Sequence, residues 1–281
     1  MKKALPWQMV LLGYKRSPDP AERARCRLFY AAIGLQGVDG LNPSDYFVSL
    51  AEKNIQGLCS YEALEEKLCR YYRRHSRSQA LTEETREADL VSLHIVQLLS
   101  QGDFSCSVRE IQKIHHFLFR DVYDFAGDFR NYDIRKKEWI LEGESVCYTD
   151  WEQIPQALSA LLEAESRFRF RGLTGRQIVD HLAEFISALW LIHPYGEGNT
   201  RTTALFLLRY LQSLGILARK DVFLDSWYFR NALVRANYSS GRVQPDRQYL
   251  KRFLENLLLR KDHPLRSQEL HLKYPDIPES T

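Results

Sequence analysis

The stretch of sequence that decides the fold is His193-Pro194-Tyr195-Gly196-Glu197-Gly198-Asn199-Thr200-Arg201, which lies between apolar runs at residues 185–192 and 204–214. Both runs carry apolar residues on nearly every helical turn, which predicts two buried helices joined by this loop. The loop contains an imidazole, a carboxylate, an amide, a guanidinium and two glycines. A connection between core helices rarely needs that set, whereas a site for a phosphate chain and a metal ion needs all of it.

Backbone and side-chain donors of this loop are suited to an anion. Gly196 and Gly198 have no Cβ, so nearby N–H groups can turn toward a bound phosphate. Asn199 and Thr200 are expected to open the next helix, whose first N–H groups have no partner within the helix. Arg201, in its first turn, adds a forked cation that fits phosphate oxygens.

Two further residues suggest chemistry. Glu197 offers a hard oxygen ligand for a Mg²⁺ ion that also contacts phosphates. His193, just before the loop, is suited to act as a general base near neutral pH. The alternative is a plain capping turn, with Asn199 as the helix cap and Glu197 in solvent. Taken together, the residues favour the phosphate and metal site.

At these residues the chain resembles Fic-domain proteins, whose signature is His-Pro-Phe-x-Asp/Glu-Gly-Asn-Gly/Lys-Arg-x-x-Arg. Tyr195 replaces Phe, Thr200 replaces Gly or Lys, and Ala204 replaces the second Arg. A second segment, residues 122–130 with the sequence VYDFAGDFR, resembles the family's Tyr-x-Trp-Ala-Gly-x-Phe-Arg. The resemblance spans roughly residues 81–259 and rests on two motifs in the family's order.

The resemblance implies a nucleotidyltransferase that moves AMP from Mg-ATP onto a Ser, Thr or Tyr hydroxyl of a target protein. His193 would deprotonate the hydroxyl, Glu197 would hold Mg²⁺, and Arg201 would bind the outer phosphates. Asn199 and the amides near Gly198 and Thr200 would bind the α-phosphate. Such a reaction needs an in-line nucleophile, a metal ion and donors aimed at the developing charge.

Ala204 departs from the family pattern at the position of an arginine that contacts the γ-phosphate. Its absence leaves two alternatives open. The enzyme could use another donor, either a different nucleoside triphosphate or a phosphocholine carrier. The chain could also be a catalytically silent module that only binds a nucleotide or a partner. Arg209 is expected to lie too far along the helix to substitute.

The fold class predicted from the pattern is mainly α, with a catalytic core at 79–262, a small helical unit at 1–78 and a flexible tail at 263–281. Residues 1–18 are expected to be irregular. Segment 131–148 is expected to form a short β-hairpin around Gly143. Expected helices are 21–35, 43–56, 61–74, 82–99, 107–119, 151–165, 174–192, 199–214, 225–237 and 247–260.

The resemblance also assigns roles outside the main motif. It implies that the hairpin is a flap over the active site, with Trp139, Ile140 and Leu141 pairing with a target segment. It implies a base pocket near Tyr228 and Asn231. Adjacent histidines at 115 and 116 are expected mainly to pack in the core.

Residues 21–74 resemble a small helical antitoxin fused in front of the core. Such units inhibit through a glutamate that pairs with the second motif arginine. The nearest match is Asp39 in the turn Gly37-Val38-Asp39-Gly40, for which a plain Asp-Gly turn is the alternative. Because Ala204 and Asp39 both depart from type, we hypothesise that the ionic lock is lost and that inhibition is steric, weak or absent.

Composition narrows the class further. A net charge of +3 gives no case for nucleic acid or a membrane surface as partner, and no apolar run reaches the length of a spanning helix. Five scattered cysteines without a C-x-x-C pair indicate reduced thiols and a cytoplasmic protein, which is compatible with delivery as a secreted effector. The oligomeric state is left open.

Overall fold

The computed structural model describes residues 5–75, 82–241 and 243–272. The chain forms two compact units, residues 1–128 with 197–226 and residues 129–196 with 227–281. Within the described residues the secondary structure is helical and no strand is present. The mainly α fold class is therefore confirmed. The division of the chain at residues 78 and 262 remains a prediction.

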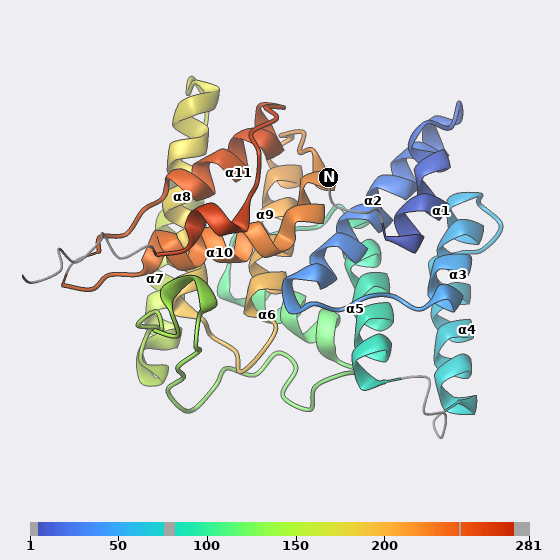
Figure 1. Ribbon diagram of the computed structural model, residues 1–281, viewed down its shortest axis with the longest axis horizontal. Coiled ribbons are helices and arrows are strands. Elements are labelled where there is room, and N and C mark those ends of the chain that lie inside the picture. Colours follow the sequence, from blue (N-terminus) through green and yellow to red (C-terminus); the bar gives the residue numbers. More distant parts are fainter. Residues whose placement is uncertain (1–4, 76–81, 242, 273–281) are drawn as a thin grey trace, which may run out of the picture. The chain divides into compact units, whose positions relative to one another are not determined.

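The first unit is built around α2 and α9 (Figure 1). Residues 29–36 of α2 are all buried, whereas its N-terminal half is mostly exposed or half-buried. Helix α2 packs against α1, α3, α5 and the 3₁₀ turn η4, and α9 packs against α5 and α6. Every residue of α9 from Asn199 to Leu211 is buried. The elements of this unit are α1 (Pro6–Lys15), α2 (Pro20–Gln36), η1 (Gly37–Asp39), α3 (Asp45–Ile55), α4 (Tyr61–Arg74), α5 (Glu83–Leu99), α6 (Val108–Phe119), α9 (Asn199–Ser213) and η4 (Lys220–Asp225).

The second unit is centred on α8, which packs against α7 and α11. A capping box at Thr174 and Gln177 begins α8, and the helix ends at His193. The elements of this unit are η2 (Trp139–Leu141), η3 (Trp151–Gln153), α7 (Ile154–Arg167), α8 (Gly175–Ile192), α10 (Ser226–Asn237, whose first residue is counted with the first unit), α11 (Gln248–Leu258) and η5 (Ser267–Leu270).

The expected helices agree with the structure to within one to three residues at their ends, but the N-terminus differs. Residues 6–15 form helix α1 rather than irregular chain. Pro6 occupies the first helical turn, where its missing N–H costs nothing, and the Gln8 side chain accepts the Leu5 N–H at 2.8 Å. Trp7 and Leu11, one turn apart, are both buried, so an apolar face holds the helix in place.

The β-hairpin expected at 131–148 is not seen. Residues 138–144 instead form a tight loop in which the Glu138 N–H donates to the Glu144 carbonyl and the Gly143 N–H donates to the Glu138 carbonyl. The loop contains the 3₁₀ turn η2. Ile140 and Leu141 are adjacent in sequence and both fully buried, which breaks the alternation that a strand requires.

The described part of the expected tail is packed rather than free. Leu270 and Leu272 are buried, and the Leu272 N–H donates to the Ile140 carbonyl at 2.7 Å. Residues 273–281 lie outside the described part of the chain. Among the described helices, none has both the length and the apolar character needed to cross a bilayer.

Candidate active site

The signature loop contributes residues to both units. His193, Pro194, Tyr195 and Gly196 belong to the second unit, and Glu197 begins the return of the chain to the first. The two halves of the loop thus belong to different units. They carry different chemistry: the histidine half offers a base, and the half that opens α9 offers donors for an anion.

His193 is held with one ring nitrogen bonded and the other unpartnered. Its Nδ1 lies 3.3 Å from the Trp190 carbonyl oxygen, which only accepts, so Nδ1 carries the proton. Nε2 is buried and has no hydrogen-bond partner among the described residues. Burial, together with the nearby cation of Lys136, lowers the pKa of His193 well below its usual 6.5. The ring is therefore neutral, with a free lone pair on Nε2.

Backbone and aromatic contacts fix the orientation of this ring. His193 follows the last residue of α8 and has a φ of +47°, a left-handed backbone conformation that residues other than glycine rarely adopt. The Tyr148 ring lies over it at a centroid distance of 4.1 Å, and Trp190 meets it edge-on at 5.1 Å. A strained backbone held by surrounding structure is typical of functional residues.

Arg130 holds the backbone around this histidine. Its N–H donates to the Pro194 carbonyl at 2.9 Å, and its Nε donates to the His193 carbonyl at 2.8 Å. The same guanidinium also donates to the carbonyls of Tyr132 and Thr149. Arg130 ends the second motif, at 122–130, so the structure gives that motif a role: it supplies the clamp for the histidine half.

In the first unit, Gly198 begins α9 with φ of +78°. A Cβ on this residue would lie 2.4 Å from Cε2 of Phe119, which is too close for any real contact. Gly198 is therefore required both by its backbone conformation and by the ring packed against it. Asn199 and Thr200 follow as the first residues of α9, and both are buried.

We expect Gly198→Ala to destabilise the protein by about 2–4 kcal/mol, because the clash forces Phe119 or the turn to move and the positive φ adds strain. Gly215→Ala is the matched control, since Gly215 also has positive φ, +70°, but nothing lies within 4 Å of its added Cβ. Urea unfolding of both variants measures the difference. Equal losses would show that backbone strain alone accounts for the effect.

His115, which was expected mainly to pack in the core, connects the two motifs of the first unit. The Gly127 N–H can only donate, so His115 Nδ1 accepts from it at 2.8 Å. Nε2 therefore carries the proton and donates to the Glu197 carbonyl at 3.1 Å. Burial lowers the pKa of His115 to about 4, which keeps this tautomer neutral. The signal for such a role was the resemblance of residues 111–118 to the family's helix before the second motif, which implied that one of the two histidines lines the site.

Arg201 is buried and is surrounded by oxygen atoms of its own unit. Its Nε lies 2.9 Å from Asp39 Oδ2, Nη2 donates to Glu87 Oε1 at 2.6 Å, and Nη1 donates to Gln36 Oε1 at 3.1 Å. The Phe119 ring lies 4.8 Å from the guanidinium carbon. Asp39 thus meets the first arginine of the motif, whereas the hypothesis paired it with the position of Ala204.

Arg209 is committed to structural contacts, as its place along α9 suggested. Its guanidinium donates to the carbonyls of Leu98 and Asp103 and lies 3.3 Å from Glu110 Oε1. Ala204 is fully buried. The cation that the family pattern places one turn after Arg201 therefore has no substitute in Arg209.

A metal ion would find one suitable ligand in the loop itself. Glu197 is exposed, and its carboxylate is a hard oxygen donor. Mg²⁺ bound to nucleotides usually takes one or two carboxylates and completes its shell with phosphate oxygens and water, so one exposed carboxylate beside the glycine turn that opens α9 fits the ion. Its assignment as the metal ligand remains a prediction.

The other predicted site residues lie in the second unit. Ile140 and Leu141 are buried, so Trp139 is the exposed side chain of the expected flap. Glu138 fixes the loop through a bidentate pair with Arg230, with distances of 2.6 and 3.0 Å. Of the two residues expected in the base pocket, Tyr228 donates its hydroxyl to the Tyr249 carbonyl at 3.2 Å. Asn231 is fully buried, and neither of its amide atoms has a hydrogen-bond partner among the described residues.

Comparison with known proteins agrees with this arrangement. Residues 105–211, which include α6, the second motif and most of α9, match the Fic/DOC family. The chain is 26% identical over 171 residues to the protein adenylyltransferase VbhT of Bartonella schoenbuchensis, which covers 55% of this chain and 34% of VbhT. It is 25% identical over 213 residues to the probable protein adenylyltransferase y4lH of Sinorhizobium fredii, covering 69% of this chain and 98% of that protein.

Solved structures show the same fold at low sequence identity. The BepC effector protein of Bartonella tribocorum, solved with bound AMPPNP, aligns with a TM-score of 0.51 at 18% identity and covers 62% of this chain and 85% of its own. A Fic family protein from Desulfovibrio desulfuricans aligns with a TM-score of 0.50 at 14% identity, covering 90% of this chain and 72% of its own. Residues 105–211 therefore match the Fic/DOC family, and these solved structures share the fold of the chain. The chain spans about a third of the length of VbhT.

Proposed function

We propose that this chain transfers AMP from Mg-ATP to a Ser, Thr or Tyr hydroxyl of a target protein. The observation that carries the proposal is His193, a buried neutral imidazole whose Nε2 has no hydrogen-bond partner among the described residues. It stands at the start of a motif that also contains the acid, the amide and the first arginine. The names of the two relatives, both adenylyltransferases, support the same reaction.

The proposed chemistry assigns one task to each residue. His193 Nε2 takes the proton of the acceptor hydroxyl as its oxygen attacks the α-phosphorus, the bond to the β-phosphate oxygen breaks, and pyrophosphate leaves. The N–H groups at the start of α9, with Asn199, face the charge that develops on the α-phosphate. Glu197 would hold Mg²⁺, which supplies neutralisation of the phosphate charge.

A second donor class is favoured by one observation. Ala204 leaves the motif without its second arginine, and Arg209 is engaged elsewhere. A donor that depends less on a γ-phosphate contact, such as a phosphocholine carrier, fits this difference. A silent binding module is the third reading, and it predicts nucleotide binding without turnover.

The test is a label-transfer assay with the full chain, Mg²⁺ and lysate as acceptor. Each of the four nucleoside triphosphates is supplied with an α-phosphate label, and γ-labelled ATP is the control. We expect label on protein from α-labelled ATP and none from γ-labelled ATP, because AMP transfer leaves the γ-phosphate in pyrophosphate. Label from the γ-position would contradict nucleotidyl transfer, and label from another nucleotide would reassign the donor.

A further inference from the structure

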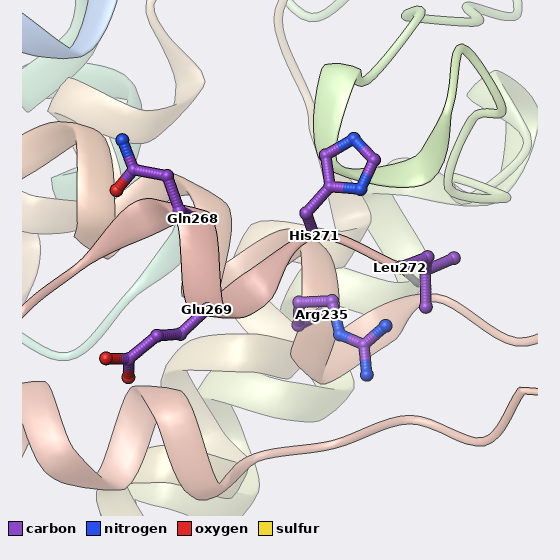
Figure 2. A pocket seen from close by; sticks show the side chains of 5 residues that line it. All are labelled: Arg235, Gln268, Glu269, His271 and Leu272. Carbon is purple, nitrogen blue, oxygen red and sulfur yellow. The ribbon is translucent and has the colours of Figure 1, made fainter. Parts of the chain in front are cut away.

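A cavity of about 540 Å³ lies in the second unit, away from the signature residues in sequence. Figure 2 shows the five residues that line it: Arg235 comes from α10, and Gln268, Glu269, His271 and Leu272 come from η5 and the residues that follow it. Its volume is in the range of pockets that hold small organic ligands. Nothing in the proposed transfer reaction uses these residues.

The unusual feature of this cavity is an arginine without an acceptor. Nε and Nη1 of Arg235 are shut off from solvent, and neither has a hydrogen-bond partner within the described residues. Because an atom the size of a water oxygen cannot reach Nε or Nη1, a ligand in the cavity would contact the guanidinium through Nη2. The Tyr249 ring lies 5.9 Å from the guanidinium carbon, at the outer limit of a cation–π contact. A partly desolvated charge without a counter-charge costs stability, so a ligand that supplied the missing charge would stabilise the native state.

The cavity's own carboxylate is already engaged by other arginines. Oε2 of Glu269 lies 3.3 Å from Nη1 of Arg252, and its Oε1 lies 3.9 Å from Nη1 of Arg266. Gln268 and His271 add side-chain donors to the cavity wall. One helical turn before Arg235, on the same side of α10, Asn231 is fully buried and its amide is also unpartnered. Unsatisfied donors thus gather along this helix, and no described residue supplies the anion.

Another cluster of ionisable residues shows what a satisfied arrangement looks like. In the first unit, Glu65, His94 and Asp121 bring three ligand atoms to within 4.8 Å of one another. Arg120 already lies among them, at 2.6 Å from Glu65 and 3.3 Å from Asp121. That cluster contains its own cation and needs no further ion, whereas none of the described residues supplies an anion to Arg235.

We infer that this cavity binds a small molecule that carries an oxyanion, either a phosphate or a carboxylate group, through the guanidinium of Arg235. The wall of the cavity is tied directly to the 138–144 loop. The His271 ring lies 5.2 Å from that of Trp139, and the Leu272 N–H donates to the Ile140 carbonyl at 2.7 Å. A ligand held by Arg235 would therefore lie against the segment that is bonded to the loop carrying Trp139.

Binding of inorganic phosphate and of acetate to the full chain tests the site, with chloride at matched ionic strength as reference. We expect one anion to raise the melting temperature of the wild type, as any ligand of the native state does. Arg235→Gln should weaken the binding of that anion at least ~10-fold, the loss of affinity expected when a charge-assisted contact is removed. Arg167→Gln is the matched control, because it makes the same charge change at an exposed position of α7.

Trp139 fluorescence reports on this cavity and separates it from phosphate bound at the signature loop. We expect the anion to change the fluorescence of the wild type and to leave that of Trp139→Phe unchanged. The two anions distinguish phosphate from carboxylate ligands. Equal thermal shifts in wild type, Arg235→Gln and Arg167→Gln, or no shift with either anion, would overturn the inference. Because the readouts are binding and stability, this result is independent of transferase activity.

Discussion

Replacing His193 with asparagine is expected to reduce AMP transfer by about 10²–10⁴-fold, the usual contribution of a general base. Asparagine tolerates the positive φ of this position, and its amide can donate to the Trp190 carbonyl as Nδ1 does now. The substitution therefore removes the lone pair of Nε2 and retains the fold. The assay is the initial rate of label transfer from α-labelled ATP at saturating Mg²⁺.

Two controls separate loss of the base from loss of structure. His181→Ala removes another histidine from the same helix, one that pairs with Glu165 at 2.8 Å, and should leave transfer near the wild-type rate. The midpoint of urea unfolding should be similar for wild type and His193→Asn. A variant that folds normally and keeps more than about a tenth of the rate would exclude His193 as the general base.

The pH dependence of transfer follows from the same residue. In the proposed reaction neutral imidazole is the active form, and burial lowers the pKa of His193 well below 6.5. Protonation should therefore begin to reduce kcat/KM only well below pH 6.5, and the rate should stay level as the pH falls through that value. A profile that already declines at pH 7 would assign the titration to another group.

How far the sequence predicted this structure depends on how local each feature is. Helix positions were predicted because capping residues and apolar periodicity act within a few turns, as at Thr174 and along 199–211. The prediction of a hairpin at 131–148 was wrong because the positions of its apolar residues are set by burial in the unit and not by pairing with a second strand. Ile140 and Leu141 both point into the core, a tertiary effect that no local pattern encodes.

Within the candidate site, residue types were easier to predict than pairings. The chemistry of the signature loop follows from its composition, and the roles assigned to it stay predictions. The partner of Asp39 could not be predicted in this way, because an ion pair between residues 39 and 201 depends on how α2 and α9 pack in the same unit. His115 shows the same limit: its two hydrogen bonds join segments that sequence reasoning treated separately.

The contacts of Arg201 lead to the second prediction. The guanidinium is 2% exposed and is bonded or paired to Asp39, Glu87 and Gln36, so its donors are turned toward its own unit. If Arg201 binds the outer phosphates, as the resemblance implies, these acceptors compete with the nucleotide. The structure therefore revises the lost-lock hypothesis: Ala204 removes one partner, but an ionic contact with Asp39 persists at Arg201.

We expect Asp39→Asn to raise the transfer rate at low ATP about fivefold, at the low end of typical coupling between sites, because the Asp39 side chain is 40% exposed and its charge is partly screened. Asp45→Asn is the control, since Asp45 is an exposed acid at the start of α3 in the same unit. A point substitution is preferable to deleting residues 1–78, because α2 packs against α5 and η4 and its loss would expose the core.

Glu87→Gln distinguishes two roles for the acids around Arg201: stabilising the buried guanidinium, and competing with the nucleotide for it. Glu87 is 16% exposed, so losing its charge beside buried Arg201 should lower the free energy of unfolding by about 1–3 kcal/mol, whereas Asp39→Asn should change it little. Urea unfolding and the KM for ATP are measured on both variants. Asp39 competes with the nucleotide if Asp39→Asn lowers KM without loss of stability. A higher KM in Asp39→Asn would mean the reverse, that Asp39 positions Arg201 for phosphate binding.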